Sequence, residues 1–166
     1  VGALSNSLNA PAPRRELLRA RLGDDEIAFE RLVQFDDVGA GDLRGARLEL
    51  LWEVCQTPDF RKIAPEQHAR LLGDIFRQIR DGARIKADWL APQVNRLDRT
   101  DGDIDAISAR IAHIRTWTYL SHRPDWLEDA AYWQERARSI EDSLSDALHE
   151  KLTQRFVDRR TSILLR

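Results

Sequence analysis

The chain has 166 residues, of which 42% are hydrophobic and 33% are charged, and its formal net charge is −2. This length fits one domain that can bury a core, and the single cysteine excludes both an internal disulfide framework and a cysteine-rich zinc site. No apolar run reaches the roughly 20 residues of a membrane span, and the charge balance excludes a uniformly basic nucleic-acid binder while leaving a local basic patch open.

Residues 1–13 are small and polar and contain two prolines, so they predict a flexible lead-in or linker before a helical domain over residues 14–166. They lack the basic start and apolar centre of a signal peptide. Methionine is absent even at position 1, and we expect the chain to be a piece of a longer protein. The acidic run at 24–26 predicts a helix N-terminus, and a loop with three glycines is expected over residues 36–45.

Two helices and a third, shorter one are expected in the middle of the chain. Residues 43–56 are so dense in apolar side chains that this helix should be buried on most sides. Pro58 ends it, and Pro65 suits the first turn of the next helix, which stops at Gly82. The shorter helix covers residues 89–97 and tolerates Pro92 only if it begins close by.

The last third of the chain has the clearest helical periodicity. Asp101 or Asp103 is a plausible cap for a helix whose apolar residues recur at spacings of three and four. They are Ile104, Ile107, Ile111, Ile114, Trp117 and Leu120. After a break at Pro124, residues 129–159 contain no glycine or proline and predict a helix of about 45 Å.

No strand-like alternation occurs, so we predict an all-α fold, an irregular helical bundle of about six helices with a long C-terminal helix. Four of the five tryptophans are expected in the core, since Trp52, Trp89, Trp117 and Trp133 lie on apolar helical faces. Trp126 follows Pro124 in a turn, where a surface contact and a cap on the bundle are both open interpretations.

The sequence contains no recognisable catalytic, cofactor or metal motif. None of the three lysines follows a glycine, so the chain has no P-loop. The glycines at 39, 41 and 45 lack the strand context of a dinucleotide loop and predict a plain loop. Nothing distinguishes a catalytic pair among the many carboxylates. Cys55 is expected to be an inert core thiol.

Four aspartates and four histidines are the candidate metal ligands of the sequence. An EF-hand that starts at Asp101 would need glycine and glutamate where Ala106 and Ala112 stand, so capping and solvation explain the acids better. No two histidines share ligand spacing on one helical face. The aspartates are Asp98, Asp101, Asp103 and Asp105, and the histidines are His68, His113, His122 and His149.

The C-terminal end carries a local excess of positive charge. After residue 150 the charged side chains sum to +4, and the candidate RNA-binding residues among them are Lys151, Arg155, Arg159 and Arg160. Lys151 and Arg155 continue the helical line of Trp133, Ile140 and Leu144. Leu148 and Leu152 lie progressively farther from that line. Either the helix bends with its apolar stripe, or it ends with a basic face aligned to the core side. Such a face can contact phosphates; alternatively, the arginines pair with neighbouring carboxylates and favour the helix C-terminus.

Three long segments resemble alphaproteobacterial relatives of the mitochondrial degradosome RNA helicase, a family of superfamily-two, DExH-type, ATP-dependent enzymes. The resemblance covers roughly residues 24–166. The segments read LLWEVCQTPDFRK (50–62), LDRTDGDIDAISARIAHIRTWTYLSHRPDW (97–126) and EDSLSDALHEKLTQRFVDRRTSILLR (141–166). In that family this stretch resembles the helical region that follows the two RecA-like motor domains, and the motor motifs are missing from this chain.

The resemblance implies a cytoplasmic accessory domain without chemistry of its own, which packs on the motor domains and helps to guide single-stranded RNA. ATP and magnesium then belong to the parent protein, and no membrane is involved. A second hypothesis is a protein–protein docking module for an RNA-degrading enzyme. A free-standing small enzyme, the third hypothesis, has no motif in its favour.

Overall fold

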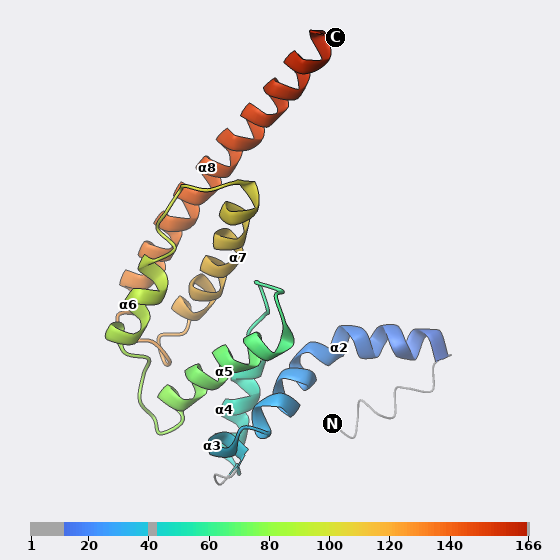
Figure 1. Cartoon of the computed structure of the whole chain (residues 1–166). Coiled ribbons are helices and arrows are strands. Elements are labelled where there is room, and N and C mark those ends of the chain that lie inside the picture. The colour runs from blue at the N-terminus through green and yellow to red at the C-terminus, as the bar shows by residue number, and fades with distance from the viewer. Residues whose placement is uncertain (1–11, 40–42, 166) are drawn as a thin grey trace. The chain divides into compact units, whose positions relative to one another are not determined.

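The computed structural model describes the backbone of residues 12–39 and 43–165, and their side chains from Gly23 onward. Over this part the chain forms helices and no strand, which confirms the all-α prediction (Figure 1). The helices are α2 (Ala12–Val33), α3 (Asp36–Gly39), α4 (Ala46–Cys55), α5 (Pro65–Ile79), α6 (Ala87–Asn95), α7 (Ile104–Ser121) and α8 (Ala130–Leu164). They fall into two compact units, Val1–Thr57 with Ile63–Phe76, and Pro58–Lys62 with Arg77–Arg166.

The first unit contains α2, α3, α4 and most of α5. Helix α2 begins at Ala12, so the predicted N-terminus at residues 24–26 is wrong, and residues 12 and 13 of the predicted lead-in are helical. The physical reason is that residues 14–22 are rich in arginine, leucine, glutamate and alanine, which are strong helix formers. The remainder of the predicted lead-in, residues 1–11, lies outside the described residues.

The predicted loop over residues 36–45 is partly helical. Asp36–Gly39 forms the single turn α3, which buries Val38, and the amide of Gly39 donates a 2.8 Å hydrogen bond to the carbonyl of Phe35. A buried valine anchors this turn to the unit, which a glycine-based loop prediction does not take into account. Gly41 of the predicted loop lies outside the described residues.

Helix α4 is buried on one side only. Leu51, Val54 and Cys55 are buried, but Leu48 is 40% exposed and Trp52 is 38% exposed. The expectation that this helix is buried on most sides, with Trp52 in the core, is therefore wrong. A helix that is apolar all round does not reveal in its sequence which face the neighbouring helices leave uncovered.

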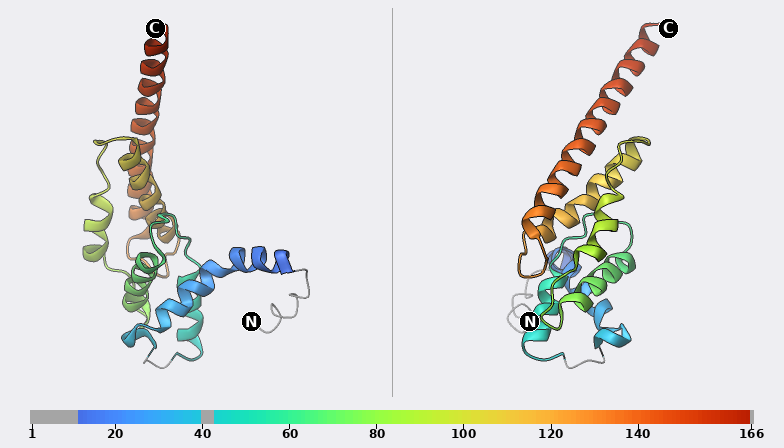
Figure 2. Two further views of the ribbon diagram at one scale, coloured as in Figure 1. Left: turned by 45° about the vertical axis from the view of Figure 1, so that its right-hand side comes forward. Right: turned by 90° about the vertical axis from the view of Figure 1, so that its left-hand side faces the viewer.

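The second unit contains α6, α7 and α8. The predicted stripe of α7 is buried from Ile107 to Leu120. Asp103, not Asp101, caps this helix, because its side chain accepts a 2.8 Å hydrogen bond from the amide of Ala106. Helix α8 packs along α7 (Figure 2) through the buried side chains Trp133, Ala137, Ile140 and Leu144.

Trp126 caps one end of this unit. Only 2% of it is exposed, and the guanidinium of Arg123 lies 3.9 Å from the centre of its ring. The carbonyl of Trp126 accepts a 2.6 Å hydrogen bond from the amide of Ile85. The carbonyl of Ile85 in turn accepts a hydrogen bond from the amide of Glu128. Of the two interpretations left open by the sequence, the structure supports the cap on the bundle.

Helix α8 has 35 residues, which corresponds to about 52 Å. Its packing against α7 includes Leu144, but every side chain from His149 to Leu165 is exposed. Figures 1 and 2 show this end of α8 extending well past α7. We call residues 149–165 the arm.

Candidate nucleic-acid interface

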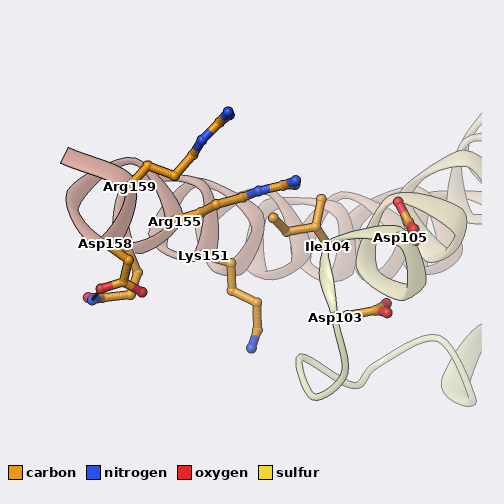
Figure 3. Close-up of a pocket in the computed structure, with 8 residues that line it drawn as sticks. Asp103, Ile104, Asp105, Lys151, Arg155, Asp158 and Arg159 are labelled. Atoms are coloured by element: carbon orange, nitrogen blue, oxygen red, sulfur yellow. Dashed lines mark hydrogen bonds between the residues drawn. The ribbon is translucent and has the colours of Figure 1, made fainter. Parts of the chain in front are cut away.

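All four predicted RNA-binding residues lie on the arm, and three of them share one side of it. Lys151, Arg155 and Arg159 are four residues apart, so they occupy successive turns on one side of α8. Together with the first turn of α7 they line a groove of about 500 Å³ (Figure 3). Arg160 is also exposed, but it does not line this groove.

The basic residues continue the face of α8 that packs in the core. Lys151 follows Leu144 by seven residues, which is nearly two full helical turns. Ile104 of α7 lines the same groove as Lys151 and Arg155. Helix α8 therefore runs on as one helix with its basic face aligned to the core side, which is the second of the two alternatives the sequence left open.

The basic side chains of the arm have no acidic partner among the residues that the structure describes. None of Lys151, Arg155, Arg159 and Arg160 makes an ion pair or a side-chain hydrogen bond there, since Asp158 accepts a 2.9 Å bond from Gln154 instead. In the packed half of the unit, by contrast, arginines are paired: Arg115 with Glu141 at 3.2 Å, and Arg136 with Asp98 at 3.0 Å. The alternative in which the arm arginines pair with neighbouring carboxylates is thus not seen in this part.

Two aspartates lie at the inner end of the groove. Asp103 is occupied as the cap of α7, and Asp105 is exposed in the first turn (Figure 3). Their negative charge makes the groove mixed in sign near α7. Farther out, residues 151–165 carry four basic side chains and one acidic one. Positive charge is therefore concentrated along the outer arm rather than at its base.

Apolar side chains flank the basic line, and sequence analysis did not identify them as functional. Leu152 is 46% exposed and Phe156 is 63% exposed, and they lie one turn apart next to Arg155 and Arg159. Their drift away from the core line was the signal in the sequence. An exposed aromatic ring beside arginines suits either a stacked base or the groove of a protein partner.

Several of the other candidate ligands have partners within the fold. Asp98 accepts from Arg136, and Asp101 accepts two hydrogen bonds from Arg99 that hold the pKa of its carboxyl down at about 2. The Nε2 atom of His68 lies 3.1 Å from the backbone carbonyl oxygen of Thr57, within hydrogen-bond distance. Among the described residues, no three His, Cys, Asp or Glu side chains are grouped so that they could hold a metal ion.

Two titratable groups are shielded by the fold. Cys55 is buried, as predicted, and burial raises the pKa of its thiol to about 12. Burial, together with the nearby charges of Arg61 and Arg96, lowers the pKa of His113 to about 4. His113 also packs against Trp117, with ring centres 5.8 Å apart. Both groups are thus uncharged at neutral pH.

Within the described part, none of the helices is long and apolar enough to cross a membrane. Neither a family model, nor a curated protein, nor a solved structure matches this chain. The resemblance to RNA helicases therefore stays an expectation from the sequence.

Proposed function

We propose that the chain is a helical accessory module of a larger ATP-dependent RNA helicase, and that its arm helps to guide single-stranded RNA. The observation that supports this function is the line of exposed basic side chains, Lys151, Arg155 and Arg159, on the part of α8 that extends past its packing with α7. Arg160 adds a fourth charge on the neighbouring face. The module has no chemistry of its own, and ATP and magnesium would be bound by the motor domains of the parent protein.

Phosphate binding follows from the chemistry of these residues. Guanidinium groups form bidentate hydrogen bonds with phosphate oxygens, and each neutralised phosphate releases counterions. Because the arm arginines make no ion pair with described residues, RNA does not have to break an existing pair to reach them. From Lys151 to Arg159 the helix rises by about 12 Å, so the arm contacts only a few phosphates and binds weakly alone.

A second candidate function is a docking module for an RNA-degrading enzyme. The observation in its favour is the exposed pair Leu152 and Phe156 beside the arginines. Aromatic and arginine side chains are enriched where protein partners bind. Replacing both apolar residues with serine leaves the arginines in place, so it should abolish docking of a protein partner while the salt-dependent contacts with RNA phosphates remain.

RNA binding can be measured by fluorescence anisotropy with a labelled single-stranded 20-mer in 50 mM salt. Replacing Arg155, Arg159 and Arg160 with alanine should weaken binding by about tenfold or more, because three phosphate contacts are lost. The matched control replaces three exposed arginines outside the arm and should bind like the wild type. These are Arg70, Arg84 and Arg138.

Equal binding by the two triple variants would contradict the proposal, as would a wild-type chain that binds no RNA in low salt. The helicase assignment has a separate test in the reading frame that encodes the chain. We expect it to contain a P-loop and a DExH box upstream of Val1. A reading frame without them would remove the assignment.

A further inference from the structure

The first unit has an open apolar groove between α2 and α4. Phe29, Leu48 and Trp52 line it, and its volume is about 570 Å³. The rings of Phe29 and Trp52 meet edge to face, with centres 6.0 Å apart and planes at 71°. Leu48 and Trp52 leave 40% and 38% of their surfaces exposed. A groove of this volume with aromatic walls is of the kind that takes up apolar side chains.

The rim of this groove is acidic. Glu26 and Glu30 of α2 lie one turn apart, and Glu49 of α4 lines the groove as well. All three are exposed, and none has a hydrogen-bond or ion-pair partner for its side chain among the described residues. Elsewhere in the same unit, Glu66 is paired with Arg31 at 2.6 Å. The rim therefore favours a partner that presents positive charge next to an apolar side chain.

The arm of this same chain presents that combination. Leu152 and Phe156 are exposed one turn apart, and they lie between Arg155 and Arg159 on one side and Arg160 on the other. The groove offers three apolar side chains and three carboxylates; this stretch of the arm offers the large apolar side chains of Leu152 and Phe156 and three guanidinium groups. An amphipathic helix lying in an apolar groove is a recurrent mode of recognition between proteins.

We propose that the groove of one copy of this chain binds the arm of a second copy. Phe156 and Leu152 pack in the groove against Phe29, Leu48 and Trp52, and the arm arginines face the glutamates of the rim. Each copy has one groove and one arm, so two copies that exchange arms form a closed, symmetric dimer. This dimer goes beyond the proposed function. It would also regulate RNA binding, since a docked arm hides the arginines proposed to bind RNA.

Sedimentation equilibrium of the full chain between 1 and 200 µM tests the proposal. We expect the mass of a dimer at the upper concentrations. Reversing the rim charge (Glu26→Arg with Glu30→Arg) should give a monomer, and so should reversing the arm charge (Arg155→Glu with Arg159→Glu). An equimolar mixture of these two variants should dimerise again, because each then meets a partner of opposite charge.

A control with the same change in charge replaces two exposed acids outside the groove, Asp24 and Asp142, with arginine. It should dimerise like the wild type. All of these substituted side chains are exposed, and far-UV circular dichroism confirms that each variant is folded. Phe156→Ser, which changes no charge, should also give a monomer because it removes the apolar anchor.

The proposal is overturned if the wild-type chain stays monomeric at 200 µM, or if open chains longer than a dimer form. It is also overturned if the rim variant associates as well as the wild type. The rim variant keeps all arm arginines and should bind RNA with at least wild-type affinity. The two failures are therefore distinguishable: a rim variant that still associates but binds RNA overturns this proposal alone, and a monomeric rim variant that binds no RNA overturns the proposed function alone.

Discussion

Helix α8 provides a direct comparison of the same substitution in a packed and an exposed setting. Leu144 is fully buried against α7, whereas Leu152, about two turns farther along, is 46% exposed. Replacing a buried leucine with alanine loses its transfer free energy and leaves a cavity, at a cost of about 3 kcal/mol. At a half-exposed helical position the same change costs roughly 0.5 kcal/mol or less, because no cavity forms and alanine is the better helix former.

Thermal and urea unfolding followed by circular dichroism at 222 nm measures both variants. For a chain of this length, about 3 kcal/mol lowers the midpoint temperature by roughly 6–12 °C. We therefore expect such a decrease for Leu144→Ala and a change of about 2 °C or less for Leu152→Ala. Equal destabilisation by the two substitutions would refute the reasoning, because it would mean that the core includes the arm.

Three further predictions concern single side chains. Asp105→Asn should strengthen RNA binding roughly twofold in low salt, since it removes a negative charge beside Lys151 and Arg155; weaker binding in the anisotropy assay would contradict this. Cys55, with a thiol pKa of about 12, should react with a thiol reagent at pH 8 only after urea unfolds the chain, and rapid modification of the folded chain would be the contrary result. His113 has a pKa of about 4 when folded, below the 6.5 of an unfolded histidine, so the free energy of unfolding should fall as the pH decreases from 6.5 towards 4. His113→Gln should reduce this pH dependence in urea titrations, and an unchanged slope would argue against it.

The helices whose ends have a local chemical cause were predictable from the sequence. Helix α5 begins at Pro65 and α7 follows the cap at Asp103, and the periodic stripe of α7 is buried as expected. The start of α2 was not predicted correctly, because strong helix formers extend this helix upstream of the acidic run at residues 24–26. The turn α3 escaped prediction because it depends on burial of Val38, a contact that no local pattern shows.

The two surfaces differ in how far the sequence predicts them. The basic residues of the arm were identified from charge and helical spacing, but their lack of partners depends on where α7 begins relative to α8. The apolar groove between α2 and α4 was not predicted, because Phe29 and Trp52 are 23 residues apart and meet only when the two helices pack. Its place on an apolar helical face predicts Trp52 as a core residue, and only the packing shows that one side of it is open.

The claim that the arm binds RNA is tested most directly by the salt dependence of binding. The logarithm of the affinity falls with the logarithm of the salt concentration by about 0.7 for each phosphate neutralised on a single strand. Contacts from Lys151, Arg155, Arg159 and Arg160 therefore predict a slope of about −3 for the wild type and about −1 for the variant without the three arginines. The control without Arg70, Arg84 and Arg138 should keep the wild-type slope. Equal slopes for the wild type and the variant in which Arg155, Arg159 and Arg160 are alanine would contradict the account.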